Sequence, residues 1–258
     1  MIHWRTILKR LRGEKVLLKL IQVEFLKLRR RRFIWLMLLA ALFMPVLALF
    51  YFKRGTGVDP IKFYNWTALS YTTWIVLPVV LGMFCTMLMY DEDQYDMLKQ
   101  LWIIPVSKMG YFLSKFVAVL IYSICFMLIT ATASGVFGVL PGYFAFEWNT
   151  TLFLLKKCLA IGVLTAFAIL PVLTVAAAQK GYILPVCVTL VYTFLGFILL
   201  MVNMYLHPLS GVTVIVNYNI PGVIFRQAIN LPLAFLCIGV WDAASALLAY
   251  IALARKAS

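Results

Sequence analysis

Six long apolar runs limit what this chain can fold into. They lie at Phe33–Phe52, Ser70–Tyr90, Phe112–Phe137, Cys158–Ala178, Tyr182–Leu206 and Leu231–Leu253. A helix needs about 20 apolar residues to cross a membrane, because each residue adds ~1.5 Å against a hydrocarbon layer of ~30 Å. The runs lack the alternation of period two that is typical of a membrane β-barrel. We therefore expect an all-α membrane protein with six transmembrane helices.

The composition agrees with insertion into a membrane. Hydrophobic residues make up 64% of the chain, whereas about 45–50% is usual for soluble domains. The polar residues are too few to cover a water-soluble globule of this length. The two histidines are isolated and the five cysteines stand singly, without a Cys-x-x-Cys pair, so we expect no metal site.

Basic residues are concentrated before the first apolar run. Of the 23 lysines and arginines, 11 lie in positions 1–32, and the chain carries a net charge of +14. Positive charge at one flank of a span keeps that flank in the cytoplasm. We therefore expect a cytoplasmic N-terminus, and six crossings return the C-terminus to the same side. This topology leaves 17 basic residues inside and 6 outside, with Lys156–Lys157 outside against the rule. It accounts for the charge without a nucleic-acid partner.

Residues 1–32 are expected to form a basic amphipathic segment, followed by a six-span domain at residues 33–258. Lys15 and Lys19 recur at helical spacing on one side of the segment, and apolar side chains fall largely on the other. A helix of this character lies in a membrane interface. Four consecutive residues then lie at headgroup level: Arg29, Arg30, Arg31 and Arg32. They either bind anionic lipid or serve only as a topology signal.

The connection after the second run begins with a cluster of acids and continues as a short amphipathic pattern. The acids are Asp91, Glu92, Asp93 and Asp96, and apolar residues at helical spacing follow: Met97, Leu98, Leu101 and Trp102. Acids favour the first turn of a helix, and Pro105 would end it. We expect a short cytoplasmic helix, which is either a docking element or only a capped surface helix.

The connection at residues 207–230 is too apolar for a solvated loop. It holds two prolines and two glycines, which prevent one long helix. We expect this segment to re-enter the outer face of the membrane in part, with a break near Pro221–Gly222.

The apolar runs are nearly free of ionisable residues, and Asp242 near the middle of the sixth is the exception. An Asp at the centre of a spanning helix costs about 2.5–3.5 kcal/mol, so it should face other helices or a wet cavity. It either contacts cargo or locks two helices together. The chain has no Gly-x-x-x-x-Gly-Lys-Ser/Thr loop for ATP and no paired catalytic groups, so we expect a protein that is not itself an enzyme.

Two stretches resemble the permease subunits of type 2 ABC exporters. The first is LIQVEFLKLRRRRFIWL, in which Val23, Glu24 and Lys27 lead into basic residues. The second is DEDQYDMLKQLWIIPVSKMGYFLSK, in which acids and a short helix precede Pro-x-Ser-Lys and a later lysine. Its matching residues are Glu92, Pro105, Ser107, Lys108 and Lys115. Many relatives have a second Glu and a Gly where this chain has Gln94 and then Tyr95 or Asp96.

The resemblance implies a mechanism and partners. Two permease chains, identical or sister, would pair with two ATP-binding subunits that hold ATP and Mg²⁺, while this chain binds no cofactor. The helix at residues 91–104 would dock into the ATPase beside the N-terminal helix. Docking needs an apolar anchor with a charged rim. Leu98, Leu101 and Trp102 would form the anchor, and Asp91, Glu92, Asp93 and Lys99 would form the rim.

The length of the chain and the PVSKMGYFLSK segment look most like permeases of lantibiotic or bacitracin self-protection exporters. These export amphipathic peptide antibiotics from the bacterial plasma membrane. The residues leave other readings open: export of a drug, glycolipid or ion, a membrane subunit without transport, or an intramembrane enzyme.

Overall fold

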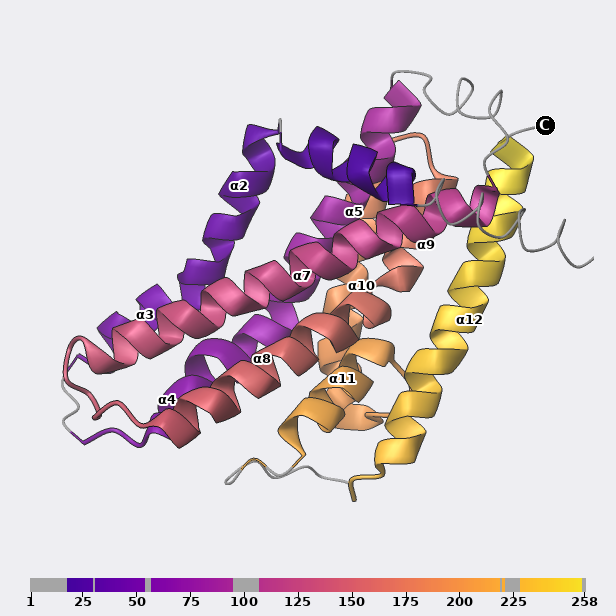
Figure 1. The fold of residues 1–258 in the computed structure, drawn as a ribbon. Coiled ribbons are helices and arrows are strands. Elements are labelled where there is room, and N and C mark those ends of the chain that lie inside the picture. Colours follow the sequence, from indigo (N-terminus) through magenta and orange to yellow (C-terminus); the bar gives the residue numbers. More distant parts are fainter. Residues whose placement is uncertain are drawn as a thin grey trace, which may run out of the picture.

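The computed structural model describes residues 18–29, 31–53, 57–94, 107–218, 220 and 228–256. These residues form helices and their connections, with no strand among them. Six helical segments are long and apolar enough to cross a membrane: Arg32–Tyr51, Pro60–Glu92, Lys108–Val139, Trp148–Ala178, Ile183–Val202 and Leu231–Arg255. The expected all-α fold with six spanning helices is confirmed (Figure 1). The proposed division at residue 33 stays a prediction.

The first span follows a helix that runs across the bundle. Residues 18–29 form this N-terminal helix, and the chain then turns into α2 (Arg32–Leu39). The span continues through a 3-10 turn, η1 (Ala40–Leu42), into α3 (Phe43–Tyr51). Figure 1 shows the N-terminal helix lying crosswise to α2, so Arg31, the residue before α2, stands at an elbow of the chain.

The second span begins ten residues earlier than the predicted Ser70. It consists of α4 (Pro60–Tyr64), the π-helical stretches η2 (Asn65–Leu69) and η3 (Thr72–Val76), and α5 (Leu77–Gln94). The early start has a local cause, because Asp59 Oδ1 accepts a hydrogen bond from the Ile61 amide at 3.0 Å. Proline suits the first helical position that follows such a cap.

The fourth span also begins earlier than expected, at Trp148 in place of Cys158. It comprises α8 (Trp148–Ala168) and α9 (Leu170–Ala178), and it follows α7 (Lys108–Val139). The prediction that Lys156–Lys157 lies in a connection was therefore wrong. A helix can carry Lys157 here because its Nζ donates to the carbonyl oxygens of Val216 at 2.5 Å and Tyr218 at 3.0 Å.

Helices α7 and α8 pack closely side by side (Figure 1). At Gly162 a β-carbon would lie 3.2 Å from Cα of Ile124 and 3.3 Å from the carbonyl oxygen of Ser123. The Ser123 hydroxyl donates to the carbonyl oxygen of Gly162 at 2.7 Å. Glycine therefore allows the two backbones to approach each other and share this bond.

Replacing Gly162 with leucine should force α7 and α8 apart. Because the obstructing atoms belong to the backbone of α7, they cannot turn aside, and overpacking of this kind costs about 1–3 kcal/mol. We expect a lower thermal unfolding midpoint in detergent. Gly135→Leu is the matched control, since a β-carbon at Gly135 meets no atom within 4 Å. Equal melting of the two variants would contradict this packing.

The last part of the chain contains a short buried helix between two spans. Helix α10 (Ile183–Val202) is followed by α11 (Pro208–Asn217) and later by α12 (Leu231–Lys256). Nearly all of α11 is buried, and it packs against α8, α10 and α12. This placement agrees with a segment that returns into the bundle. The predicted break at Pro221–Gly222 lies outside the described residues.

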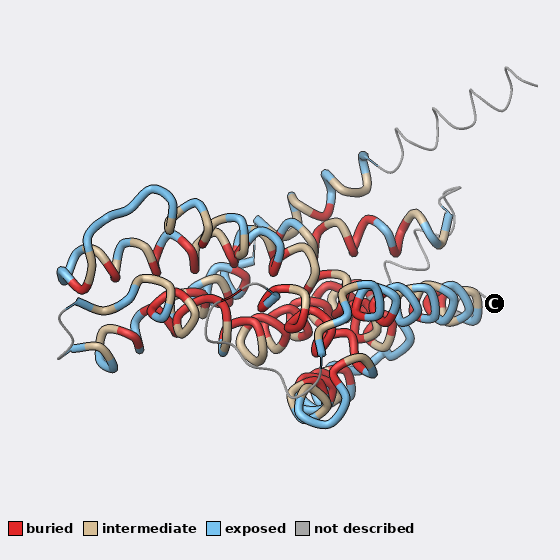
Figure 2. Tube along the Cα trace, turned by 90° about the horizontal axis from the view of Figure 1, so that it is seen from below, coloured by how far each residue is buried: buried red, intermediate tan, exposed pale blue. Residues whose placement is uncertain are grey.

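The arrangement of the helices gives the bundle two distinct ends. The N-terminal helix and the end of α12 lie at one end, whereas α11 and the start of α12 lie at the other (Figure 1). An even number of crossings places the beginning and the end of the chain at the same end of the bundle. Buried residues follow the middle of the bundle, and α12 is largely exposed outside it (Figure 2). Exposed apolar helices of this length fit contact with lipid or with other subunits. The cytoplasmic position of both termini stays a prediction.

Candidate functional site

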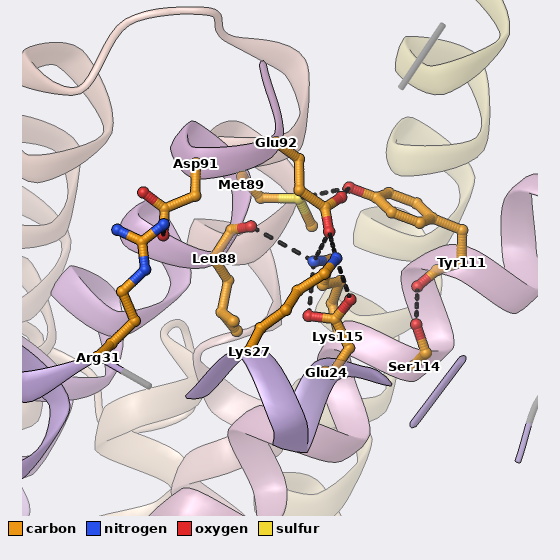
Figure 3. A network of polar contacts seen from close by, with 10 residues as sticks. All are labelled: Glu24, Lys27, Arg31, Leu88, Met89, Asp91, Glu92, Tyr111, Ser114 and Lys115. Atoms are coloured by element: carbon orange, nitrogen blue, oxygen red, sulfur yellow. Dashed lines mark hydrogen bonds and ion pairs between the residues drawn. The ribbon is translucent and has the colours of Figure 1, made fainter. Parts of the chain in front are cut away.

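Four charged residues from three helices meet inside the protein, near the end where the N-terminal helix lies. Glu24 and Lys27 come from the N-terminal helix, Glu92 from the end of α5 and Lys115 from the first turns of α7 (Figure 3). The exposed fractions are 4% for Glu24, 5% for Glu92 and 1% for Lys115. We call these four residues the charge network.

Lys115 lies at the centre of the charge network. Its Nζ donates to Glu24 Oε2 at 2.7 Å, to Glu92 Oε1 at 2.5 Å and to the carbonyl oxygen of Leu88 at 3.4 Å. An ammonium group has three hydrogens to donate. All three therefore have an acceptor in a place that water barely reaches.

Further hydrogen bonds from Lys27 and Tyr111 reach the carboxylates of Glu24 and Glu92. Lys27 Nζ donates to Glu92 Oε1 at 2.6 Å and to Glu24 Oε1 at 3.2 Å. The Tyr111 hydroxyl, one turn before Lys115 on α7, donates to Glu92 Oε2 at 2.5 Å. Every carboxylate oxygen in the charge network thus accepts at least one hydrogen bond (Figure 3).

The sequence places these side chains by simple spacing. Glu24 and Lys27 are three residues apart, so both extend from the same face of the N-terminal helix. Leu88 and Glu92 are four apart on α5, and Tyr111 and Lys115 are four apart on α7. Three helices thereby direct matched pairs of groups to one point.

The charge network is electrically balanced, which makes its burial possible. Two carboxylates face two ammonium groups, and each group is also hydrogen-bonded. Removing one member of a buried ion pair costs about 3–5 kcal/mol, because the remaining charge is left unpaired. The network therefore holds the N-terminal helix, α5 and α7 in one fixed arrangement.

Lys27 is the most exposed member, with 40% of its side chain accessible. Partial burial opposes its charge, but the carboxylates of Glu92 and Glu24 outweigh that effect and raise the pKa of Lys27 above its usual value. A raised lysine pKa means that this residue stays positively charged, and its contribution to stability is lost only as pH rises through that higher pKa.

A second ion pair braces the elbow. Arg31 contacts Asp91 with an N–O distance of 3.0 Å. Both side chains are partly accessible, so the pair contributes less than the buried network does. It nevertheless links the residue before α2 to the same turn of α5 that carries Glu92 (Figure 3).

The predicted docking residues divide into two groups in the structure. Glu92 was assigned to the charged rim of the docking element, but the structure places its side chain in the charge network, where it is 5% exposed. Asp91 is partly exposed and paired. The side chain of Asp93 and the whole of Leu98, Lys99, Leu101, Trp102 and Pro105 lie outside the described residues.

The end of the predicted loop has a clear structural role. Ser107 Oγ accepts a hydrogen bond from the Gly110 amide at 3.1 Å and so caps α7. Lys108 is the first residue of the helix. This cap fixes where α7 begins, and it sets Tyr111 and Lys115 on the face that meets α5.

The other predicted residues lie apart from the charge network. Arg29 and Arg32 are exposed at the elbow, and Arg30 lies outside the described residues. Asp242 is half-buried on α12, and its Oδ1 has no hydrogen-bond partner among the described residues. No group of three or more His, Cys, Asp or Glu side chains that could hold a metal ion occurs in the described part of the chain.

Tyr111 is the member of this site that sequence reasoning missed. A tyrosine near a helix start carries no signal of its own. The sequence signal for this site was Lys115. It lies near the start of an apolar run, where a lysine needs hydrogen-bond acceptors from neighbouring helices.

The comparison with known families bears directly on this site. A family model described as "ABC-2 family transporter protein" matches residues 20–196, which include the whole charge network. The chain belongs to the ABC-2 transporter family. No match to a curated protein was found. An ABC-2 permease is the transport subunit within the membrane, and it works with separate ABC ATP-binding subunits. The chain is accordingly a multi-pass membrane permease.

Proposed function

We propose that this ABC-2 permease serves an ATP-driven exporter of the bacterial plasma membrane, and that the charge network carries the coupling. The observation behind this proposal is that Glu92 and Lys115 flank residues 95–106, while Glu24 and Lys27 belong to the N-terminal helix. Any displacement of this connection or of the N-terminal helix is then passed to α5 and α7 together.

In this proposal the connection at residues 95–106 meets the ATP-binding subunit. Leu98, Leu101 and Trp102 provide an apolar anchor, and Asp91, Asp93 and Lys99 provide charges around it. Glu92 does not contact the ATP-binding subunit in this proposal. Its bonds in the charge network fix the position at which the connection leaves α5. ATP and Mg²⁺ stay on the ATP-binding subunits, of which there are two for two permease chains.

The cargo that we propose is an amphipathic peptide antibiotic of the lantibiotic or bacitracin kind. The resemblance of the PVSKMGYFLSK segment supports it. A groove of about 550 Å³ between α7 and α8, at the end opposite the charge network, adds support because its lining is almost entirely apolar. Ala131, Gly135 and Phe146 are among the residues that form it. A small drug, a glycolipid or an ion is the alternative cargo.

A panel of antibiotics tests this proposal. Cells that express the permease with its ATP-binding subunit should withstand several-fold higher concentrations of at least one lantibiotic or bacitracin than cells that lack it. Protection should vanish with a variant of the ATP-binding subunit that binds ATP without hydrolysing it. Unchanged sensitivity to every peptide, together with raised tolerance to a small drug, would favour the alternative cargo.

A further inference from the structure

A small groove lies in the elbow between the N-terminal helix and the first and third spans. Its volume is about 210 Å³, and its lining is almost entirely apolar. The walls include Phe25 and Leu28 of the N-terminal helix, Trp35 and Leu38 of α2, and Ile121 and Cys125 of α7. Arg29 also lines it, so a cationic group stands at an apolar slot.

The arginines at this elbow differ in their ion-pair contacts. Arg31 turns toward α5 and pairs with Asp91. Arg29 and Arg32 are exposed, and neither has an ion-pair partner in the part of the chain that the structure describes. The Arg29 guanidinium therefore lines the groove without a counterion, and Arg32, also without an ion-pair partner among the described residues, follows three residues later as the first residue of α2. The neighbouring charges are balanced within the protein.

The position of the elbow decides which ligand fits. Arg32 is the first residue of a spanning segment, so this residue lies at the level of lipid headgroups. An acyl chain matches an apolar slot beside a span, and a phosphate matches unpaired arginines. A soluble anion has no acyl chain and would leave the apolar groove unfilled.

We propose that the elbow binds one anionic phospholipid, with an acyl chain in the groove and the phosphate at Arg29 and Arg32. The bound lipid supports the N-terminal helix along the face that carries Phe25 and Arg29, next to the face that carries Glu24 and Lys27. It occupies one defined site, in addition to the general contact of the helix with the membrane. This inference rests on the elbow alone, and it holds whether or not the proposed cargo is correct.

The test is a count of lipids that stay bound to the full-length chain, made by native mass spectrometry in detergent with phosphatidylglycerol or phosphatidylcholine added. An arginine near the membrane surface raises the affinity for an anionic lipid over a zwitterionic lipid roughly fivefold. We expect one phosphatidylglycerol per chain, retained on the order of 25-fold more tightly than phosphatidylcholine, because two arginines contribute. The double variant Arg29→Gln/Arg32→Gln should abolish the preference, and Cys125→Trp should lower retention by filling the groove.

The control Lys53→Gln/Lys156→Gln removes two exposed basic charges near the opposite end of the bundle and should change nothing. Ile121→Phe fills the same groove and replaces Cys125→Trp if that variant does not fold. Equal retention of both lipids overturns the proposal. Unchanged retention in the groove-filling variants also overturns it, since headgroup attraction alone would then explain the preference. A dimer that Cys125→Trp dissociates would assign the groove to a second copy of the chain.

Discussion

Lys115→Met is expected to destabilise the permease by about 3–5 kcal/mol, because it leaves the buried carboxylates of Glu24 and Glu92 with Lys27 as their one remaining cation in the network. The methionine fills a similar volume, so the loss reflects charge and hydrogen bonds more than packing. Unfolding in detergent, followed by heat or by denaturant, measures the effect. Lys156→Met removes an exposed lysine and should change stability by less than about 0.5 kcal/mol.

A double variant distinguishes the charge network from ordinary packing. Glu92→Gln/Lys115→Met removes one charge of each sign and leaves Glu24 paired with Lys27. We expect this variant to be more stable than the sum of the single effects implies, by at least about 1 kcal/mol. Strict additivity would mean that Glu92 and Lys115 do not depend on each other, and the network would lose its proposed role.

Trp102→Ala is expected to separate the permease from its ATP-binding subunit. A buried tryptophan at the centre of an interface contributes on the order of 2–4 kcal/mol, which corresponds to a loss of about 30- to 1,000-fold in affinity. Co-purification of the two subunits from membranes measures the change. The permease itself should remain folded, because the core of the described residues is packed from the helices on either side of residues 95–106.

Trp148→Ala is the matched control for this variant. Trp148 is 65% exposed at the start of α8, near the other end of the bundle, so its removal should leave the two subunits associated. Loss of association in both variants would indicate a general effect of removing tryptophan. Normal association in Trp102→Ala would remove the connection at residues 95–106 from the docking interface.

The six spanning helices could be predicted from the sequence, since burial in a bilayer requires long apolar runs. The residues at which these helices begin and end were predicted less well. Lys156–Lys157 looked like a connection because two adjacent lysines rarely lie within a span. The structure places the pair in α8, where the carbonyl groups at the end of α11 bind Lys157. Such an acceptor lies 59 residues away in sequence, so no local pattern predicts it.

The charge network was predictable in its members but not in its geometry. Glu24, Lys27, Glu92 and Lys115 all stood out by resemblance to the family. Their neighbours suggested a solvated acidic loop for Glu92, because Asp91 and Asp93 flank it. The contact with Lys115 depends on how α5 packs against α7, and only the three-dimensional arrangement shows that Glu92 turns inward.

The sidedness of residues 95–106 tests the central claim most directly. Pro105→Cys, introduced into a chain whose five cysteines are replaced, provides one thiol for a maleimide that cannot cross membranes. We predict no labelling in intact cells and full labelling in inside-out vesicles, because this end must face the cytoplasmic ATP-binding subunit. Labelling from outside intact cells would contradict the account.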